Sequence, residues 1–273
     1  MIVDAHHHLW TADYAWLQDP SLERIRRDYT VDDLRAALRA AGVDRTVLVE
    51  AGRGDDAETA EFLRTALETP EIAGVVGWAS LASPRLAETI ERHRAGPGGH
   101  LLAGIRDQVQ AHGPDHLDGL HAGLAAVAAA GLVNELVVRS DQLPSVARAA
   151  AAFPDSTFVL DHLGKPAIAG GALAEWRALI APVAARPNVV AKLSGLVTEA
   201  DPGTWTAADL RPYVATAVEL FGTDRLMFGS DWPVCELAAG YTEVKDALVE
   251  TLGGTPEDVF GGTAVSTYRL ELP

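Results

Sequence analysis

The feature that most limits the possible folds of this chain is a regular alternation of short β-rich runs with amphipathic helical runs. Strands are predicted over residues 2–6, 45–50, 72–78, 102–108, 134–140, 157–162, 188–194 and 225–231. Helices are predicted over residues 31–41, 57–68, 84–94, 117–130, 143–153, 173–185, 207–221 and 241–252. This alternation requires a parallel sheet, and eight repeats in about 250 residues predict a closed (β/α)8 barrel, the α/β fold known as the TIM barrel. We expect residues 1–273 to form one domain.

A doubly wound open sheet is the alternative fold for such an alternation. That fold would carry a glycine-rich phosphate-binding turn after its first strand. Here the turn reads His6-His7-His8-Leu9-Trp10 and contains no glycine, which favours the barrel. Helix boundaries also carry signals: residues 30 and 33 resemble a capping box, and glycines 42, 222 and 253 stand where helices should end. A proline at position 84 is expected at the first turn of its helix.

Composition excludes several classes of protein. No apolar run of ~18 residues is long enough to span a bilayer, and the formal net charge of −16 argues against a nucleic-acid partner. The first residues lack the basic region of a secretory signal, and the single cysteine, Cys235, cannot form an internal disulfide. We therefore expect a soluble, cytoplasmic protein that acts on a small molecule. The oligomeric state stays open.

Polar side chains gather at the predicted carboxyl ends of the strands, where barrels carry their active sites. In chain order these residues are His6, His8, Glu50, Trp78, Arg106, Gln108, Arg139, Asp141, His162, Lys192, Ser194 and Asp231. A random distribution would scatter such groups among loops and helices. Their recurrence at matching points predicts a site built from many strands.

Four of these residues form a complete ligand set for a divalent ion. His6, His8 and His162 offer imidazole nitrogens and Asp231 offers a carboxylate, a set that suits one ion such as zinc. Such an ion could polarise a carbonyl group and lower the pKa of water toward ~7. Asp231 is the natural acceptor of the water's proton, so we expect it to be both a ligand and the general base.

The alternation of side chains along the first strand sorts its polar residues. It predicts that Asp4, His6 and His8 share one face and that His7 points the other way. Asp4 is expected to be a buried hydrogen-bond acceptor below the site. His7 is expected to pack outside the site and bond a backbone carbonyl.

The fourth predicted strand limits the number of ions to one. Barrels with two ions bridge them with a carboxylated lysine at this point, whereas Arg106 stands here. Arg106 is suited to polarise a carbonyl oxygen through its forked donors, a catalytic role. Glu50 could pair with Arg106 or Arg53, or contact substrate hydroxyls. Lys192 could bind a substrate oxygen or form a salt bridge with a neighbouring carboxylate.

Three further residues are candidates for positioning the substrate. Arg139 and Trp78 follow the fifth and third predicted strands, and Trp10 follows the first. The tryptophans are core or rim aromatics by default, and each could line a pocket.

With these elements placed, the chain resembles the amidohydrolase superfamily, and within it the amidohydrolase-related (amidohydrolase 2) family. The similarity is to its sugar lactonases of the L-fucono- and L-rhamnono-lactone type. The matching segments are residues 2–10 (IVDAHHHLW), 104–106 (GIR), 138–139 (VR) with 143–144 (LP), 160–166 (LDHLGKP), 192–196 (KLSGL) and 227–233 (MFGSDWP). This resemblance implies a distorted TIM barrel that hydrolyses a cyclic ester. It also implies that Asp231 activates water and that His6, His8 and His162 form a metal site.

The resemblance leaves the reaction and the metal partly open. Some members of the group hydrolyse lactones without an ion, using arginine and histidine donors, so the metal could be dispensable. Related enzymes decarboxylate aromatic acids, and others open 2-pyrone-4,6-dicarboxylate. The first hypothesis is hydrolysis of a sugar-acid lactone to its aldonic acid, with decarboxylation or pyrone hydrolysis as the alternative. A barrel that only binds a sugar acid is the third and weakest.

Overall fold

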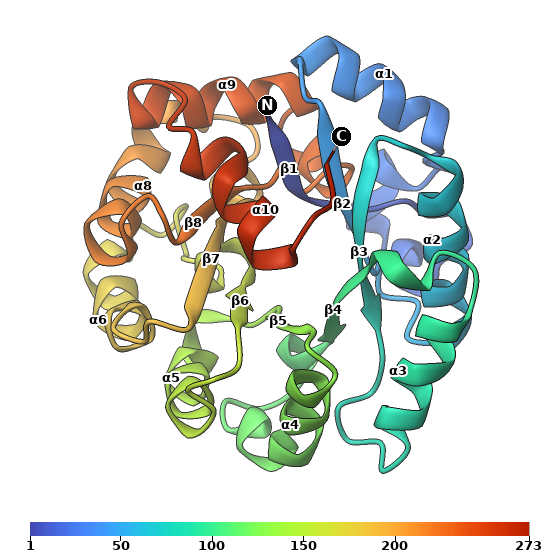
Figure 1. The fold of residues 1–273 in the computed structure, drawn as a ribbon. Helices are drawn as coiled ribbons and strands as arrows, with labels where there is room; N and C mark the ends of the chain where they lie inside the picture. Colours follow the sequence, from blue (N-terminus) through green and yellow to red (C-terminus); the bar gives the residue numbers. More distant parts are fainter. Residues whose placement is uncertain (273) are drawn as a thin grey trace.

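A computed structural model of the chain, described over residues 1–272, contains eight parallel strands in the order β1 to β8. The first four strands are β1 (Val3–His7), β2 (Arg45–Val49), β3 (Ile72–Trp78) and β4 (Leu102–Asp107). The others are β5 (Val133–Leu136), β6 (Phe158–Leu160), β7 (Val189–Leu193) and β8 (Leu226–Phe228). Backbone bonds from His8 N to Trp232 O (2.7 Å) and from Asp231 N to His6 O (2.8 Å) join the segment after β8 to β1. The predicted (β/α)8 barrel is confirmed (Figure 1).

Helices surround the strands on the outside of this barrel (Figure 1). They are α1 (Val31–Ala41), α2 (Asp56–Glu68), α3 (Leu86–Ala95), α4 (His121–Ala129), α5 (Leu143–Ala152), α6 (Leu173–Ala184), α7 (Leu196–Glu199), α8 (Ala207–Phe221), α9 (Tyr241–Leu252) and α10 (Thr263–Tyr268). The predicted capping box of Thr30 and Asp33 is formed at the start of α1. No helix within residues 1–272 is long and apolar enough to cross a membrane.

Two kinds of boundary differ from the prediction. Strands β5, β6 and β8 end earlier than predicted. After β6 and β8 the chain leaves the sheet, and His162 and Asp231 in these turns line the site. Helix α3 begins at Leu86 and not at Pro84, and its cap residue is Arg85. The helix predicted over 117–130 divides into a short 3-10 turn, His116–Leu120, followed by α4.

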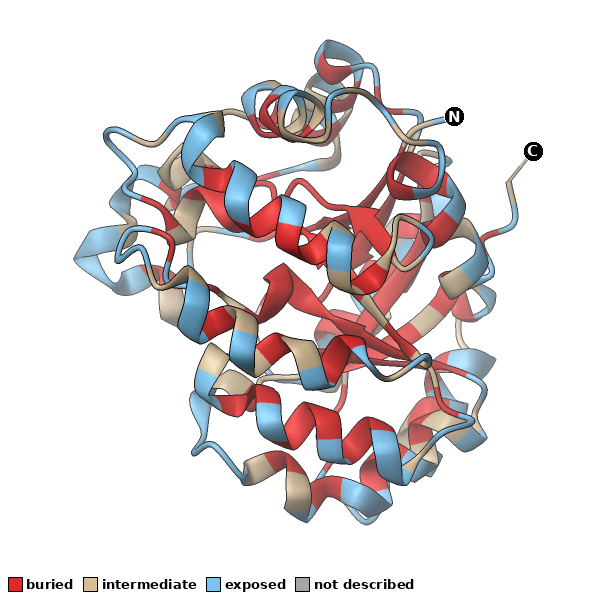
Figure 2. Ribbon diagram, turned by 90° about the vertical axis from the view of Figure 1, so that its left-hand side faces the viewer, coloured by how far each residue is buried: buried red, intermediate tan, exposed pale blue. Residues whose placement is uncertain are grey.

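The barrel has two hydrophobic layers. The larger layer lies between the strands and the surrounding helices, whose inner faces are buried and outer faces exposed (Figure 2). The smaller layer fills the interior and consists mainly of small and β-branched strand residues: Val3, Ala5, Val47, Val49, Val76, Val133, Val159 and Met227. Helix α10 lies across the end of the barrel where the strands begin (Figure 1). The carboxyl ends of the strands are therefore left for polar side chains.

Candidate active site

A bulge in β1 decides which of its side chains enter the barrel. In the pairing with β2, Asp4 faces Thr46 and His7 faces Leu48, so β1 carries one extra residue between these points. Ala5 belongs to the interior cluster, yet His6 and His8 also reach the interior site. The prediction that Asp4 shares their face is wrong, because a bulge reverses the side-chain alternation.

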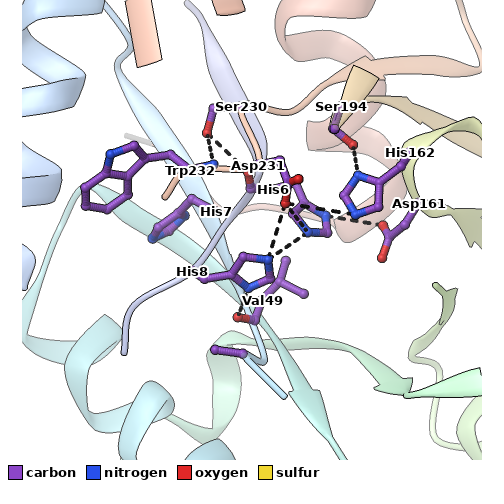
Figure 3. A network of polar contacts seen from close by, with 12 residues as sticks. His6, His7, His8, Val49, Asp161, His162, Ser194, Ser230, Asp231 and Trp232 are labelled. Carbon is purple, nitrogen blue, oxygen red and sulfur yellow. Dashed lines mark hydrogen bonds and ion pairs between the residues drawn. The ribbon is translucent and has the colours of Figure 1, made fainter. Parts of the chain in front are cut away.

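Asp4 instead lies on the outer side of β1, where its hydrogen bonds join β1 to the segment after β8. Its carboxylate is fully buried and accepts bonds from His6 N (3.0 Å) and Ser230 N (2.9 Å). It also accepts from the hydroxyls of Ser230 (2.6 Å) and of Tyr241 in α9 (2.6 Å). The expectation of a buried acceptor is confirmed. His7 points away from the site in Figure 3, and its Nδ1 bonds Val47 O at 3.0 Å, as predicted.

Three of the four predicted ligands, His6, His8 and Asp231, place possible ligand atoms within 4.8 Å of one another, and His162 forms a second such group with His6 and Asp161 (Figure 3). The Nε2 atoms of His8, His6 and His162 lie 3.5, 3.7 and 4.0 Å from Asp231 Oδ1. The Nε2 atoms of His6 and His8 are 3.1 Å apart. All four side chains are buried. The segments that carry them are β1 and the turns after β6 and β8.

The outer nitrogens of these imidazoles are held by the surrounding protein. His8 Nδ1 donates to Val49 O at 2.9 Å, which leaves the Nε2 lone pair facing the site. His162 Nδ1 bonds the Ser194 hydroxyl at 2.8 Å. His6 Nδ1 lies 3.3 Å from Asp161 Oδ1 and 3.0 Å from Lys192 Nζ. Each ring is thus oriented by a group outside the site.

Burial lowers the pKa of two of these histidines, His6 and His162, and keeps them neutral. Desolvation lowers the pKa of His162 to about 4, against the opposing attraction of the Asp231 and Asp161 carboxylates. Burial and the Lys192 ammonium lower the pKa of His6 well below its ordinary value. Burial raises the pKa of Asp231, but His162, His8 and Lys165 outweigh it, so the pKa falls below its ordinary value. Neutral imidazoles beside an ionised carboxylate are the protonation states that bind a cation.

The geometry fits one divalent ion. Bonds of 2.0–2.1 Å in a tetrahedral site place neighbouring donor atoms about 3.3 Å apart. The observed separations of 3.1 to 4.0 Å bracket that value. The Nε2 lone pair of His8 points at His6 Nε2, a contact that a shared cation would stabilise. His6, His8 and Asp231 can therefore hold a metal, and His162 lies beside them with Nε2 4.0 Å from Asp231 Oδ1.

Unusual backbone conformations bring these residues to the site. Asp231 has a φ of 56°, and His162 begins a run of four left-handed residues that ends at Lys165 with a φ of 54°. Such conformations are unfavourable for residues other than glycine and persist only where the surroundings impose them. Gly195 approaches closely: a Cβ there would lie 2.7 Å from His162 Nδ1. A Cβ at Gly229 would lie 2.8 Å from that of His6, so only glycine lets the two segments approach so closely here.

Arg106 lies beside the histidines between two carboxylates. Its Nε donates to Glu50 Oε1 at 2.6 Å and its Nη1 to Asp161 Oδ2 at 2.9 Å. The remaining Glu50 contacts are with Gln108 and the backbone of Gly52. The sequence left open whether Glu50 pairs with an arginine or contacts substrate. In the structure Glu50 pairs with Arg106, and both oxygens of its carboxylate already accept hydrogen bonds.

Lys192 is enclosed in the barrel interior. Its ammonium is fully buried, 2.6 Å from Glu135 Oε1 and 3.1 Å from Asp161 Oδ1. Burial and the Asp161 charge raise the pKa of Glu135 to about 7. Of the alternatives for Lys192, the structure contains the salt bridge. Asp161 and Glu135, for which the sequence predicted no role, complete the charges beneath the histidines.

A cavity of about 420 Å³ opens above this cluster. The residues His8, Arg106, His162 and Asp231 form its floor. The walls combine aromatic, small and polar residues: Trp10, Trp16, Ala51, Gly52, Gln108, Gln110, Ala111, Val137, Lys165, Gly195, Thr198, Glu199 and Val234. A concave, partly apolar space with a few convergent polar groups is typical of a small-molecule site.

The structure brings together most, but not all, of the predicted site residues. Trp10 lines the cavity as predicted, but within residues 1–272 the lining does not include Trp78, Glu50, Lys192 or Arg139. Trp78 is half-buried, and its backbone is held by Thr59. Arg139 is exposed on the turn after β5, where it bonds the carbonyls of residues 110 and 112. Side-chain parity alone could not place these residues: Glu50 and Arg139 lie beyond the ends of β2 and β5, Trp78 is the last residue of β3, and Lys192 lies deep within β7.

Three wall residues that come from loops were not predicted from the sequence. Trp16 precedes the first helix, and Lys165 and Glu199 follow β6 and β7. Lys165 stands within the segment 160–166 on which the family resemblance rests. Its position three residues after His162 was the one signal for a role at the site.

The chain belongs to the Amidohydrolase family, whose family model matches residues 3–270. The fold and the placement of the histidines and aspartate at the carboxyl ends of the strands agree with this membership.

Particular relatives cover nearly the whole chain. It is 40% identical to an L-fucono-1,5-lactonase of Burkholderia multivorans, over 99% of this chain and 97% of the relative. It is 34% identical to an L-fucono-1,5-lactonase of Burkholderia ambifaria, over 99% of this chain and 96% of the relative. The crystal structure of an amidohydrolase from Burkholderia multivorans with bound zinc matches with a TM-score of 0.92 and 38% identity, over 99% of this chain and 100% of that one.

Proposed function

We propose that this protein hydrolyses the 1,5-lactone of a small sugar acid, such as L-fucono-1,5-lactone, to the aldonic acid. The observation that carries the proposal is the position of Asp231 in the cavity floor, with Oδ1 within 4.0 Å of the imidazole nitrogens of His6, His8 and His162. The relatives with 40% and 34% identity named as L-fucono-1,5-lactonases support this substrate class.

Asp231 is the proposed general base. Its pKa lies below the ordinary value, because the neighbouring His162 and His8 outweigh the effect of burial, so the carboxylate is ionised at neutral pH. It accepts a proton from water as the water oxygen bonds the lactone carbonyl carbon. It returns that proton to the ring oxygen as the ester C–O bond breaks. The product is a hydroxy acid, which ionises and releases one proton to the solution.

The carbonyl oxygen gains negative charge during this attack and needs donors. Arg106 lies in the cavity floor, and Glu50 and Asp161 fix the orientation of its guanidinium. A donor held in place before the reaction stabilises the developing charge without reorganisation. When bound by His6, His8, His162 and Asp231, a divalent ion supplies a Lewis acid for the same oxygen. Zinc is the proposed ion, since the zinc-bound relative has 38% identity and the ligand set is of nitrogen and oxygen.

The cavity wall suits an uncharged ring. Trp10 and Trp16 meet edge to face, with ring centroids 5.2 Å apart, and offer an apolar surface for the C–H groups of a sugar ring. The lining cations, Arg106 and Lys165, are matched by the lining acids Glu199 and Asp231. A wall without excess positive charge disfavours a dicarboxylate such as a pyrone diacid. We therefore propose a neutral lactone, handled in the cytoplasm, as the substrate.

A pH-indicator assay against aldonolactones and pyrone lactones tests this function, with wild type and Asp231→Asn in parallel. Each protein is measured as purified, after chelation, and after zinc is added back, and CO2 is measured with aromatic acids. The proposal expects acid release from a 1,5-aldonolactone by wild type and its loss in the variant. Recovery by zinc after chelation would support the metal. Release of CO2 with no lactone turnover would overturn the proposal in favour of a decarboxylase.

A further inference from the structure

Two charged residues face the cavity without a part in the steps above. Lys165 follows β6 and Glu199 ends α7, and both line the wall above the floor. Both are half-buried. Neither forms an ion pair within 4.0 Å with the other or with any residue in the described range 1–272, whereas Arg106 and Lys192 each form two. Their charges are therefore available to a ligand.

The backbone holds Lys165 firmly in this position. It ends the left-handed run that begins at His162, and its N–H donates to His162 O at 2.8 Å. The Ser140 hydroxyl donates to its carbonyl at 2.9 Å. The ammonium donates to Gln110 Oε1 at 2.6 Å, a neutral partner that also lines the cavity. An ammonium has three N–H donors, so two remain for a ligand.

Glu199 supplies acceptors on the same side of the cavity. Within residues 1–272 its carboxylate accepts no hydrogen bond, although its backbone carbonyl accepts one from Ala169 N. Burial raises its pKa, the Lys165 charge opposes this, and the Asp231 charge adds to it. Lys165, Glu199 and Asp231 all line the same cavity.

We propose that Lys165 and Glu199 form the subsite that recognises the ring hydroxyls of the lactone, with Lys165 donating to one hydroxyl and Glu199 accepting from a neighbouring one. This inference rests on the proposed lactonase function and adds the basis of its preference for sugar lactones. A site whose buried polar groups bond a substrate hydroxyl discriminates strongly against an analogue that lacks it, because those groups are left unpaired. The pair also opposes an acidic substituent, since Glu199 would repel a carboxylate that Lys165 attracts.

Two lactones of the same ring size test the assignment: L-fucono-1,5-lactone, which carries hydroxyls, and δ-valerolactone, which carries none. We expect Lys165→Met and Glu199→Gln each to lower kcat/KM for the hydroxylated lactone roughly tenfold or more. Turnover of δ-valerolactone should fall by a clearly smaller factor than turnover of the hydroxylated lactone. Lys245→Met, at a half-buried lysine in α9, and Glu175→Gln, at an exposed glutamate in α6, are matched controls away from the cavity, and thermal melting verifies that all variants fold.

A binding measurement makes the test independent of turnover. Trp10 and Trp16 in the cavity wall report, by fluorescence, the binding of L-fucose, a hydroxylated ring that cannot be hydrolysed. We expect both variants to weaken this binding about tenfold or more and the controls to leave it unchanged. Equal loss of both lactone activities, or unchanged L-fucose binding in both variants, would overturn the subsite. Wild type that binds L-fucose but hydrolyses neither lactone would instead overturn the proposed function.

Discussion

Removing the Asp4 carboxylate should destabilise the protein far more than removing an ordinary surface carboxylate. Asp4 is fully buried and accepts four hydrogen bonds, two from backbone N–H groups and two from hydroxyls. Each buried donor left without an acceptor costs roughly 1–3 kcal/mol. The hydroxyls can turn to other acceptors, as Ser230 can to His6 O at 3.3 Å, but the N–H groups of His6 and Ser230 cannot. Asp4→Ala should therefore cost about 3–5 kcal/mol.

Urea unfolding followed by circular dichroism measures this cost. Asp4→Asn keeps one oxygen for the two N–H groups and should lose only about 1–2 kcal/mol. Because Asp4 holds the bulge that aims His6, Asp4→Asn should also lower kcat/KM at least about tenfold under conditions in which it is fully folded. Asp246→Asn, at an exposed carboxylate in α9, is the control and should change neither quantity. An Asp4→Ala variant within about 1 kcal/mol of wild type would refute the reasoning.

Three further predictions concern the histidines and their surroundings. His162 has a pKa of about 4 in the folded chain against an ordinary value of 6.5, so the folded state binds fewer protons between these values. The contribution of His162 to the free energy of unfolding is therefore complete above pH 6.5. It should fall by roughly 3 kcal/mol as the pH drops to about 4. Unfolding measured at each pH should not show this loss in His162→Gln. Gly195→Ala places a Cβ 2.7 Å from His162 Nδ1 and 3.2 Å from Asp231 Oδ2, and should lower kcat/KM about 100-fold, whereas Gly113→Ala, in open space, should not. His8→Ala should weaken zinc binding at least about 100-fold by calorimetry, and zinc affinity equal to wild type would remove His8 from the ligand set.

The barrel was predictable because its repeating pattern is local. Apolar side chains recur with a period of two in each strand and a period near 3.6 in each helix. Both periods can be recognised from the sequence without knowledge of tertiary contacts. Helices α1, α8 and α9 begin and end at the predicted residues, since capping residues and glycines mark their ends. The gathering of the candidate ligands at one end of the barrel was predictable for a related reason: in a parallel barrel the carboxyl ends of all strands meet at one face.

The direction predicted for the Asp4 side chain was wrong because of the bulge in β1. A strict period of two has no place for an extra residue, and one extra residue reverses every side chain beyond it. The local sequence signal for the bulge is Asp4 itself. Its carboxylate accepts a hydrogen bond from His6 N, two residues further along the chain, and so competes with the sheet for that donor. That bond forms here because Ser230 and Tyr241, far away in sequence, bond the same carboxylate.

The cavity walls could not be predicted because loops build them. Trp16, Lys165 and Glu199 reach the cavity through turns whose paths depend on tertiary contacts, such as that of Ser140 with the backbone of Lys165. Conversely, Lys192 has the inward parity of a site residue but lies too deep, where it bonds Glu135. Parity fixes the direction of a side chain, and its depth along the barrel follows from the stagger of the strands.

The hydrolysis of L-fucono-1,5-lactone by wild type and by Asp231→Asn, corrected for spontaneous opening, tests the central claim most directly. A positioned general base typically contributes roughly 10²–10⁴-fold, so the account predicts a loss of kcat/KM of about that size in the folded variant. A variant that retains wild-type turnover would contradict the assignment of Asp231 as the base and, with it, the mechanism proposed for this barrel.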